Sequence, residues 1–430
     1  MTTPEPAAPV WIESFLHWLT PRRLRAQAIV LALCLWGVCA VDFATPGLFD
    51  RAGNIKFQDF LPFYISAHLI AQHREALLYD RGTQQKELEE IVGTTRAEVP
   101  YLYGPQVALL FIPLVSLPFA AAAGIWVVIS VLIYFGCLYL LWKHCRALDS
   151  GPASRARNSS VKLQFLLPAL AFPPLFHVFV RGQISALILL CFTAAYLAFQ
   201  SNRPWLAGIA LGFLILKPQF LLAVPLILLF ARTWKSLSGL LLSAAGQLAS
   251  ACLYFGATVM EKYFDLLIHP QRWLSATELS LAPIQMHSLR AFWTLLIPSQ
   301  TIAFSLYAVT SLLTIALAAA IWRSHASLAL RFSALIVATI LVNPHLFIYD
   351  LLILAPALLL IVNWCLANRQ QKLSSCLLAL CYLAFVLPLF GPLSRWTHLQ
   401  LSVIVFATLL WTLFCFPRTG ELASPESLVV

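Results

Sequence analysis

Residues 119–142 read FAAAAGIWVVISVLIYFGCLYLLW and contain no Asp, Glu, Lys or Arg. An α-helix rises about 1.5 Å per residue, so about 20 such residues cross the hydrocarbon core of a bilayer. The core of a soluble protein does not require an uninterrupted apolar run of this length. The stretch therefore predicts a membrane-spanning helix, and runs of similar length recur along the chain.

The composition agrees with that prediction. Of the 430 residues, 60% are hydrophobic and only 11% are charged, and the formal net charge is +10. A basic balance is also typical of nucleic-acid-binding proteins, but basic cytoplasmic loops of a membrane protein explain it without a nucleic-acid partner. The ten cysteines lie mostly in apolar runs without a CxxC pair, which favours small buried side chains over disulfides or a metal. We predict an all-α polytopic membrane protein.

The apolar runs predict about 11–13 transmembrane helices. The N-terminus has no short apolar region followed by a cleavage site, so the first run is expected to be retained in the mature protein. We place the spans at about 24–41, 119–142, 162–180, 183–200, 204–217, 219–231, 236–256, 302–322, 327–342, 350–366, 373–390 and 398–416.

Charge predicts the orientation. With a cytoplasmic N-terminal segment (1–23) and tail (417–430), the whole positive excess falls on the cytoplasmic side, as the positive-inside rule expects. Residues 24–416 then form one transmembrane domain in the plasma (inner) membrane. Its two long extracytoplasmic loops are 42–102 and 257–301. Residues 103–118 contain three prolines, which predict a re-entrant or short tilted helix before the full span at 119–142.

The first long loop is too long to be a plain connector. Residues 64–79 have helical spacing, with apolar positions on one side and His73, Arg74 and Glu75 among the polar ones. This pattern predicts a helix lying on the membrane surface, followed by a more soluble helical piece at 81–98. The same loop holds Asp59.

Under this topology, several polar residues gather at the outer face. Ionisable groups at membrane ends are costly unless they are paired, reach water or serve a function. A carboxylate and several cations on one side of a bundle are what sugar transfer from a lipid phosphate requires: a base for the acceptor hydroxyl and positive charge for the departing phosphate. The residues are Asp59, Arg181, Gly182, Gln183, Lys217, Asn343, His345 and Asp350.

Each residue also has a plainer interpretation. Asp59 has the residue type of an N-cap for the helix that follows it. Arg181 and Lys217 have the position of helix-end cations whose charged groups reach water. His345 is equally compatible with a hydrogen bond at a helix end. For Asp350 we favour a structural ion pair with Lys or Arg. The histidines show no metal-binding spacing, so no metal or cofactor is predicted.

The order of these motifs resembles glycosyltransferase family 87. The matching pieces are an Asp-Phe followed by tyrosine, Leu-Tyr-Asp, Tyr-x-Tyr-x-Pro, Gly-Gln, Gly-x-x-Leu-Gly leading to Lys-Pro, and Asn-Pro-His near an Asp. In this chain they stand at 59–64, 78–80, 101–105, 182–183, 208–218 and 343–350. The chain departs from the family at Gly104, where the family tends to have proline.

The resemblance implies a GT-C-type membrane fold and a polyprenyl-phosphate-mannose-dependent α-mannosyltransferase. The residues themselves do not exclude another hexose or arabinofuranose as the donor sugar. It implies that Asp59 is the catalytic base and that a basic or His residue at the late outer turn maps onto His345. We expect a glycolipid or glycan acceptor, membrane lipids as surroundings, and inversion at the anomeric carbon. The expected donor-phosphate and substrate-binding residues are Arg181, Gln183, Lys217, His345, Tyr64 and Asn343.

Two other classes of protein remain open from the sequence. A transporter or lipid flippase would place ionisable residues near the middle of the membrane and often has repeated halves, and we find no internal repeat. A non-catalytic assembly subunit would tolerate Asp59→Asn without a change in cellular glycolipids.

Overall fold

The computed structural model describes residues 18–93, 100–149, 166–272, 283–368 and 372–415. Within these ranges the chain is helical, and extended pairing is limited to two isolated bridges, Phe49 with Ile55 and Met286 with Phe347. The all-α polytopic class predicted from the apolar runs is confirmed.

Six segments of the described chain are long and apolar enough to cross a bilayer. Shorter apolar helices accompany them. Each predicted span coincides with one of these long segments or shorter helices, except that the described part of the predicted span at 162–180 is interrupted. The long segments are α2 (Pro21–Phe43), α6 (Phe119–Trp142), α13 (Trp234–Phe255), α17 (Gln300–Trp322), Ile348–Ala367 and Leu373–Thr397. The shorter ones are Pro105–Leu114, Ser185–Gln200, Pro204–Leu216, Pro218–Phe230, Leu328–Val342 and Leu401–Cys415.

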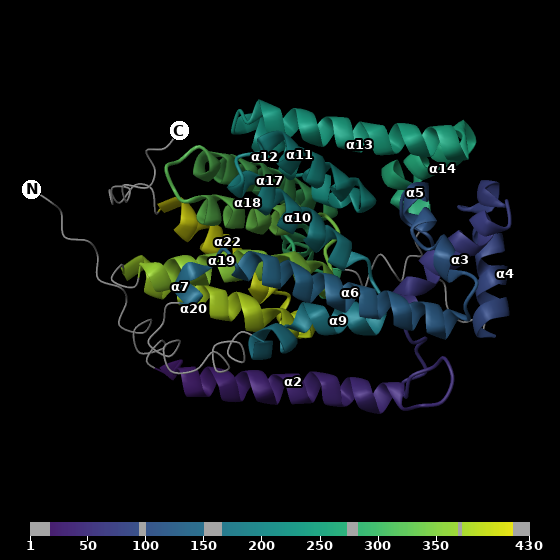
Figure 1. The fold of residues 1–430 in the computed structure, drawn as a ribbon, viewed down its shortest axis with the longest axis horizontal. Coiled ribbons are helices and arrows are strands. Elements are labelled where there is room, and N and C mark those ends of the chain that lie inside the picture. The colour runs from purple at the N-terminus through teal and green to yellow at the C-terminus, as the bar shows by residue number, and fades with distance from the viewer. Residues whose placement is uncertain (1–17, 94–99, 150–165, 273–282, 369–371, 416–430) are drawn as a thin grey trace, which may run out of the picture.

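The long helices run in roughly the same direction, with α2 along one edge of the molecule and α13 along the opposite edge (Figure 1). Helix α18 (Leu328–Val342) lies inside, with nearly every side chain from Phe332 to Val342 buried. On the outer helices large apolar side chains face outward, for example Leu132 and Leu253. Apolar surface of this kind suits contact with lipid, so the chain is a membrane protein.

The elements of the first long loop gather at one end of the bundle (right in Figure 1). They are η1 (Gln58–Phe60), α3 (Leu61–Ala71), η2 (Glu75–Leu77) and α4 (Arg81–Val92), with α5 (Pro105–Leu109) and α14 (Ala257–Ile268) beside them.

The prediction of one surface helix over 64–79 is wrong. Helix α3 ends at Ala71, and His73 adopts a positive φ of 56° that a continuing helix does not allow. Its residues from Leu61 to Ala67 are all buried, because α5 and α6 cover it. The second predicted piece corresponds to α4, whose N-terminus is capped by the Asp80 carboxylate accepting from the Thr83 backbone N–H at 2.8 Å.

Prolines organise the segment before α6. Pro105 opens α5, Pro113 lies in the short helix Ile112–Leu114, and Pro118 is the N-cap of α6. This agrees with a short helical piece followed by one long helix, while the sides on which the loops lie stay a prediction. The predicted span at 162–180 begins outside the described residues, and α9 (Pro173–Arg181) forms its second part.

Candidate active site

Asp59 lies in η1 at the end of the bundle that holds α3 and α4. Its carboxylate accepts a hydrogen bond from Gln183 Nε2 at 3.0 Å, and its other oxygen lies 3.9 Å from Arg181 Nη1. The side chain of Asp59 is 21% exposed. The N-cap of α3 is Phe60, which has no side-chain capping bond, so the interpretation of Asp59 as the cap of this helix is wrong.

The chain reverses at Gly182 to bring Arg181 and Gln183 to Asp59. Gly182 has φ of 74°, the left-handed conformation that often ends a helix, and a Cβ there would lie 2.8 Å from Phe60 Cβ. Its carbonyl accepts from Trp126 Nε1 at 3.0 Å. Glycine is therefore required here both for the turn and for close contact with η1.

Tyr103 fixes the orientation of the Gln183 amide. Its hydroxyl donates to Gln183 Oε1 at 3.1 Å, and the backbone N–H of Ile184 donates to the same oxygen at 3.3 Å. With its oxygen held in this way, Gln183 presents its NH2 group to Asp59. We did not single out Tyr103 from the sequence, although it belongs to the Tyr-x-Tyr-x-Pro motif.

A second polar group lies beside the first. Lys217 Nζ is 2.6 Å from Asp350 Oδ1 and donates to Ser185 Oγ at 3.3 Å, and Ser185 Oγ donates to the same Asp350 oxygen at 2.8 Å. Lys217 and Asp350 are each 1% exposed. The structural ion pair predicted for Asp350 is confirmed, and Lys217 does not reach water as a helix-end cation would.

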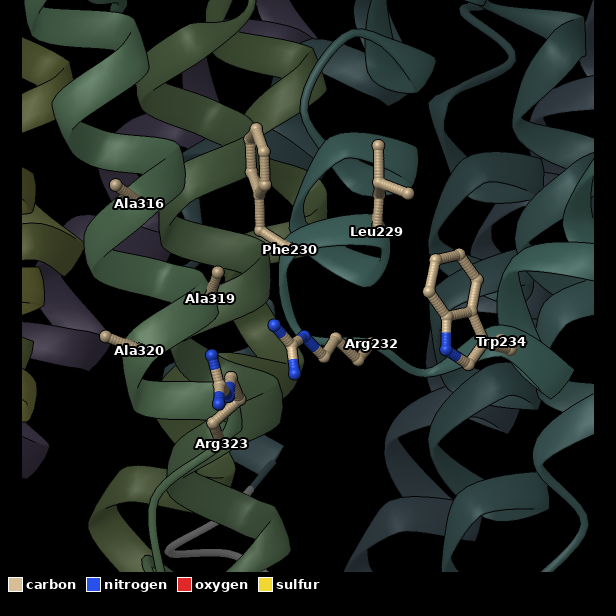
Figure 2. Close-up of a pocket in the computed structure, with 8 residues that line it drawn as sticks. All are labelled: Leu229, Phe230, Arg232, Trp234, Ala316, Ala319, Ala320 and Arg323. Atoms are coloured by element: carbon tan, nitrogen blue, oxygen red, sulfur yellow. The ribbon is translucent and has the colours of Figure 1, made fainter.

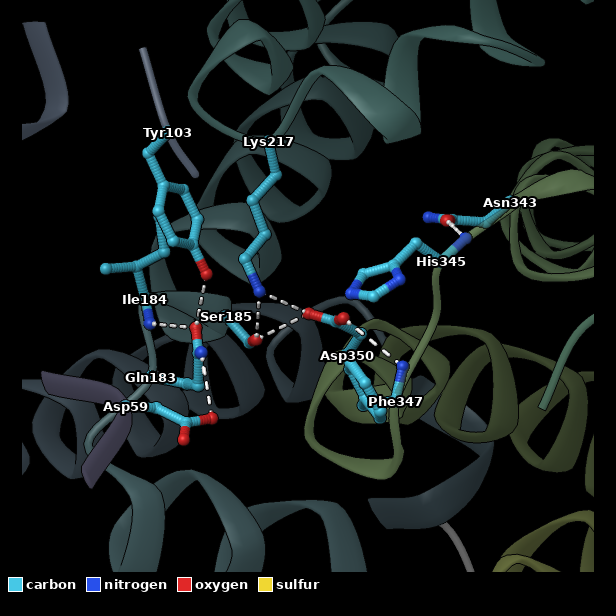
Figure 3. Close-up of polar contacts among 10 residues, drawn as sticks. All are labelled: Asp59, Tyr103, Gln183, Ile184, Ser185, Lys217, Asn343, His345, Phe347 and Asp350. Carbon is cyan, nitrogen blue, oxygen red and sulfur yellow. Dashed lines mark hydrogen bonds and ion pairs between the residues drawn. The ribbon is translucent and has the colours of Figure 1, made fainter. Parts of the chain in front are cut away.

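The two groups meet at the start of α10 (Ser185–Gln200). Gln183 contacts Asp59 and Tyr103, while Ser185, two residues later, contacts Lys217 and Asp350 (Figure 3). One short piece of backbone therefore links the acid near the surface to the buried ion pair.

Asn343 and His345 form the third part of the site. Asn343 is fully buried, and its Oδ1 accepts from the His345 backbone N–H at 2.9 Å. Its Nδ2 has no hydrogen-bond partner in the described part of the chain. The His345 ring points toward the Lys217–Asp350 pair (Figure 3) and meets the Phe347 ring edge to face at 4.7 Å. Burial lowers the pKa of the His345 imidazole to about 4, so the ring is neutral at neutral pH.

Tyr64 lies apart from these contacts. Its hydroxyl donates to the Leu117 carbonyl at 2.7 Å, and its ring packs against His68 and Phe119. The structure thus gives Tyr64 a packing role, and its predicted part in substrate binding stays a prediction.

The environment of Asp59 makes it a stronger base than a free aspartate. Burial raises its pKa, and the charges of Arg181 and Lys217 and the Gln183 hydrogen bond oppose that shift. Arg181 is 44% exposed, so it is the cation of this site that a ligand can reach from outside. Among the described residues, no three His, Cys, Asp or Glu side chains gather as metal ligands do.

Comparison with known proteins identifies the family to which the chain belongs. The profile of glycosyltransferase family 87 matches residues 101–344, a range that includes Tyr103, Arg181, Gln183, Lys217 and Asn343. No curated protein and no solved structure matches the chain. Since the match covers more than half of the 430 residues, the chain belongs to glycosyltransferase family 87.

Proposed function

We propose that this glycosyltransferase moves a hexose, with mannose as the first candidate, from a polyprenyl-phosphate sugar to a glycolipid or glycan acceptor. The reaction takes place at the extracytoplasmic face of the plasma (inner) membrane. One observation carries the proposal: a partly exposed carboxylate, Asp59, stands next to the exposed guanidinium of Arg181.

Asp59 acts as the general base. The acceptor hydroxyl gives its proton to the Asp59 carboxylate as its oxygen bonds to the anomeric carbon. The bond from that carbon to the phosphate oxygen breaks, and the polyprenyl phosphate leaves with the electron pair. A single displacement of this kind inverts the anomeric configuration. Support comes from the raised pKa of Asp59, which makes the carboxylate a better proton acceptor near neutral pH.

Arg181 is the first contact for the departing phosphate. A guanidinium binds phosphate oxygens through two parallel N–H groups and keeps its charge at every working pH. The charge of Lys217 is already balanced by Asp350. Lys217 therefore stabilises the phosphate only if its ammonium group contacts Asp350 and the phosphate at the same time. His345 is neutral and offers a hydrogen bond rather than a charge. Asn343 Nδ2, which has no partner among the residues that the structure describes, supplies a further donor.

The experiment is sugar transfer by the purified protein in liposomes, from radiolabelled polyprenyl-phosphate-mannose to a membrane lipid extract. Asp59→Asn keeps the shape of the side chain and its bond to Gln183 but removes the base. We expect a loss of about 100-fold or more in rate with donor binding retained. Asp265→Asn, at a partly exposed acid that pairs with Arg272, is the matched control and should keep wild-type transfer.

Equal transfer by wild type and Asp59→Asn would remove Asp59 from the mechanism. Transfer by wild type from another polyprenyl-phosphate sugar, but not from the mannose donor, would keep the mechanism and change the sugar. Failure with every polyprenyl-phosphate donor would overturn the lipid-phosphate part of the proposal.

A further inference from the structure

A groove of about 600 Å³ opens between the end of α12 (Val224–Phe230), the start of α13 and the end of α17. Its walls are apolar, with Phe230 and Trp234 on one side and three alanines of α17 on the other (Figure 2). Phe230 is 51% exposed and Trp234 61% exposed. The apolar walls are therefore open to the surroundings of the bundle.

Two arginines lie in this groove. Arg232 extends from the α12–α13 turn and Arg323 from the end of α17, and their guanidinium groups point into the same space (Figure 2). Within the described ranges, neither forms an ion pair with a carboxylate. Two like charges directed at one space repel each other unless an anion lies between them. The arrangement is thus complementary to an anion.

The turn itself does not require an arginine at 232. Arg232 has φ of 59°, a left-handed conformation that favours glycine. The helix end is closed by backbone bonds, from Arg232 N–H to the Leu229 carbonyl at 3.0 Å and from Thr233 N–H to the Leu228 carbonyl at 3.0 Å. The Arg232 side chain takes no part in these backbone bonds. We therefore look for its role in what the guanidinium group binds.

The groove is separate from the proposed active site. Helix α18 has 15 residues, begins at Leu328 close after Arg323, and ends at Val342 next to Asn343. A helix of that length spans about 22 Å. The two arginines therefore lie toward the opposite end of the bundle from Asn343 and the buried Lys217–Asp350 pair.

We propose that this groove binds an anionic phospholipid of the surrounding membrane. The phosphodiester lies between Arg232 and Arg323, because guanidinium pairs bind phosphate oxygens strongly and a basic pocket between membrane helices is typical of anionic headgroup sites. One acyl chain follows the apolar wall formed by Phe230 and the α17 alanines. Trp234 lies at the rim, the position in which tryptophan anchors at the interface between lipid and water.

The test uses the full-length protein purified in detergent, with native mass spectrometry to count bound lipid and a thermal-unfolding titration to measure affinity. The ligands are phosphatidylglycerol, phosphatidylcholine of the same chain length, inorganic phosphate and polyprenyl phosphate. The variants are Arg232→Gly and Arg323→Gln. Arg232→Gly is expected to keep the fold because glycine suits the left-handed turn. Lys235→Gln and Arg203→Gln remove nearby cations that do not line the groove and serve as controls.

We expect wild type and both controls to retain phosphatidylglycerol in preference to phosphatidylcholine, and each groove variant to bind it at least tenfold more weakly. Inorganic phosphate alone should bind far more weakly, since it has no acyl chain to cover the apolar wall. Equal retention of phosphatidylglycerol by wild type and both groove variants would overturn the proposal. So would arginine-dependent binding of polyprenyl phosphate with no preference for phosphatidylglycerol. None of these measurements depends on sugar transfer, so the lipid site and the proposed function fail or stand separately.

Discussion

At the scale of single residues, the proton affinity of Asp59 sets the expected pH dependence. As the proposed base, Asp59 acts only when it is deprotonated, and burial raises its pKa above the ordinary aspartate value of 3.8. As the pH is lowered, the rate of sugar transfer should therefore begin to fall at a pH above 3.8. Arg181 favours the charged carboxylate, so Arg181→Met should move this acidic limb to higher pH.

The measurement is the pH profile of kcat/KM for wild type and Arg181→Met. Arg272→Met, at an exposed arginine that pairs with Asp265, is the control and should leave the limb in place. A limb that stays at the same pH in Arg181→Met would contradict the assignment of that limb to Asp59, whatever happens to the absolute rate.

Tyr103 is expected to act as a positioning residue. Its hydroxyl holds Gln183 Oε1, and Gln183 in turn donates to Asp59. Tyr103→Phe removes one neutral hydrogen bond, which corresponds to about tenfold in kcat with little change in KM. Gln183→Leu should cost more, because it also removes the bond to the carboxylate. Tyr254→Phe, at an exposed tyrosine on α13, is the control. Unchanged kcat in both site variants would exclude this relay.

The pair of Lys217 and Asp350 allows stability to be separated from catalysis. Lys217→Met leaves a buried carboxylate without its cation and should cost about 3–5 kcal/mol of unfolding free energy. Adding Asp350→Asn removes that charge and should restore most of the thermal stability in detergent. If Lys217 also shares the departing phosphate, the double variant folds but transfers slowly. Full transfer by a stable double variant would limit Lys217 to a structural role.

At the scale of elements, glycines explain how α11 (Pro204–Gly212) packs against α13. A Cβ on Gly208 would collide with the Ser236 carbonyl, and one on Gly239 with the Trp205 carbonyl. The Gly-x-x-Leu-Gly motif thus has a packing function in this chain. Gly208→Ala should lower the free energy of unfolding by about 1–3 kcal/mol.

Gly246 provides the matched control for that prediction. It lies on α13 with nothing within 4 Å of an added Cβ, so Gly246→Ala should be neutral or stabilise the helix by about 0.5–1 kcal/mol. Thermal unfolding of the two variants in the same detergent compares them. Equal melting temperatures would show that the backbones of α11 and α13 can separate without cost.

The sequence predicts the ends of a helix well where local sequence features alone set them. Helix α6 matches its predicted span of 119–142 at both ends, because an apolar run and the Pro118 before it are local features. Helix α3 was placed wrongly because its apolar positions suit a lipid surface and a protein interior equally well. Only the packing of α5 and α6 around it distinguishes the two.

At the scale of the whole molecule, the bundle gathers polar groups at two distant ends. One end holds Asp59, Arg181 and the buried ion pair; toward the other, Arg232 and Arg323 share an apolar groove. Sites that lie far apart and share no partners respond to substitutions independently. The proposed active site and the proposed phospholipid site can therefore be tested on the same purified protein.

The sequence by itself determined the class of protein and several residues of its candidate site, but not Tyr103 or Ser185. Span length, proline positions and the order of motifs are properties of neighbouring residues, and they led to a polytopic membrane protein resembling glycosyltransferase family 87, with Asp59, Arg181 and Lys217 among its proposed site residues. Only the tertiary structure decided which polar side chains pair with each other. Asp59 meets Gln183 across 124 residues of sequence, and Lys217 meets Asp350 across 133. The physical reason is that a charge inside the protein must be paired to be stable. The packing of the whole bundle determines which side chain lies within hydrogen-bond distance of it.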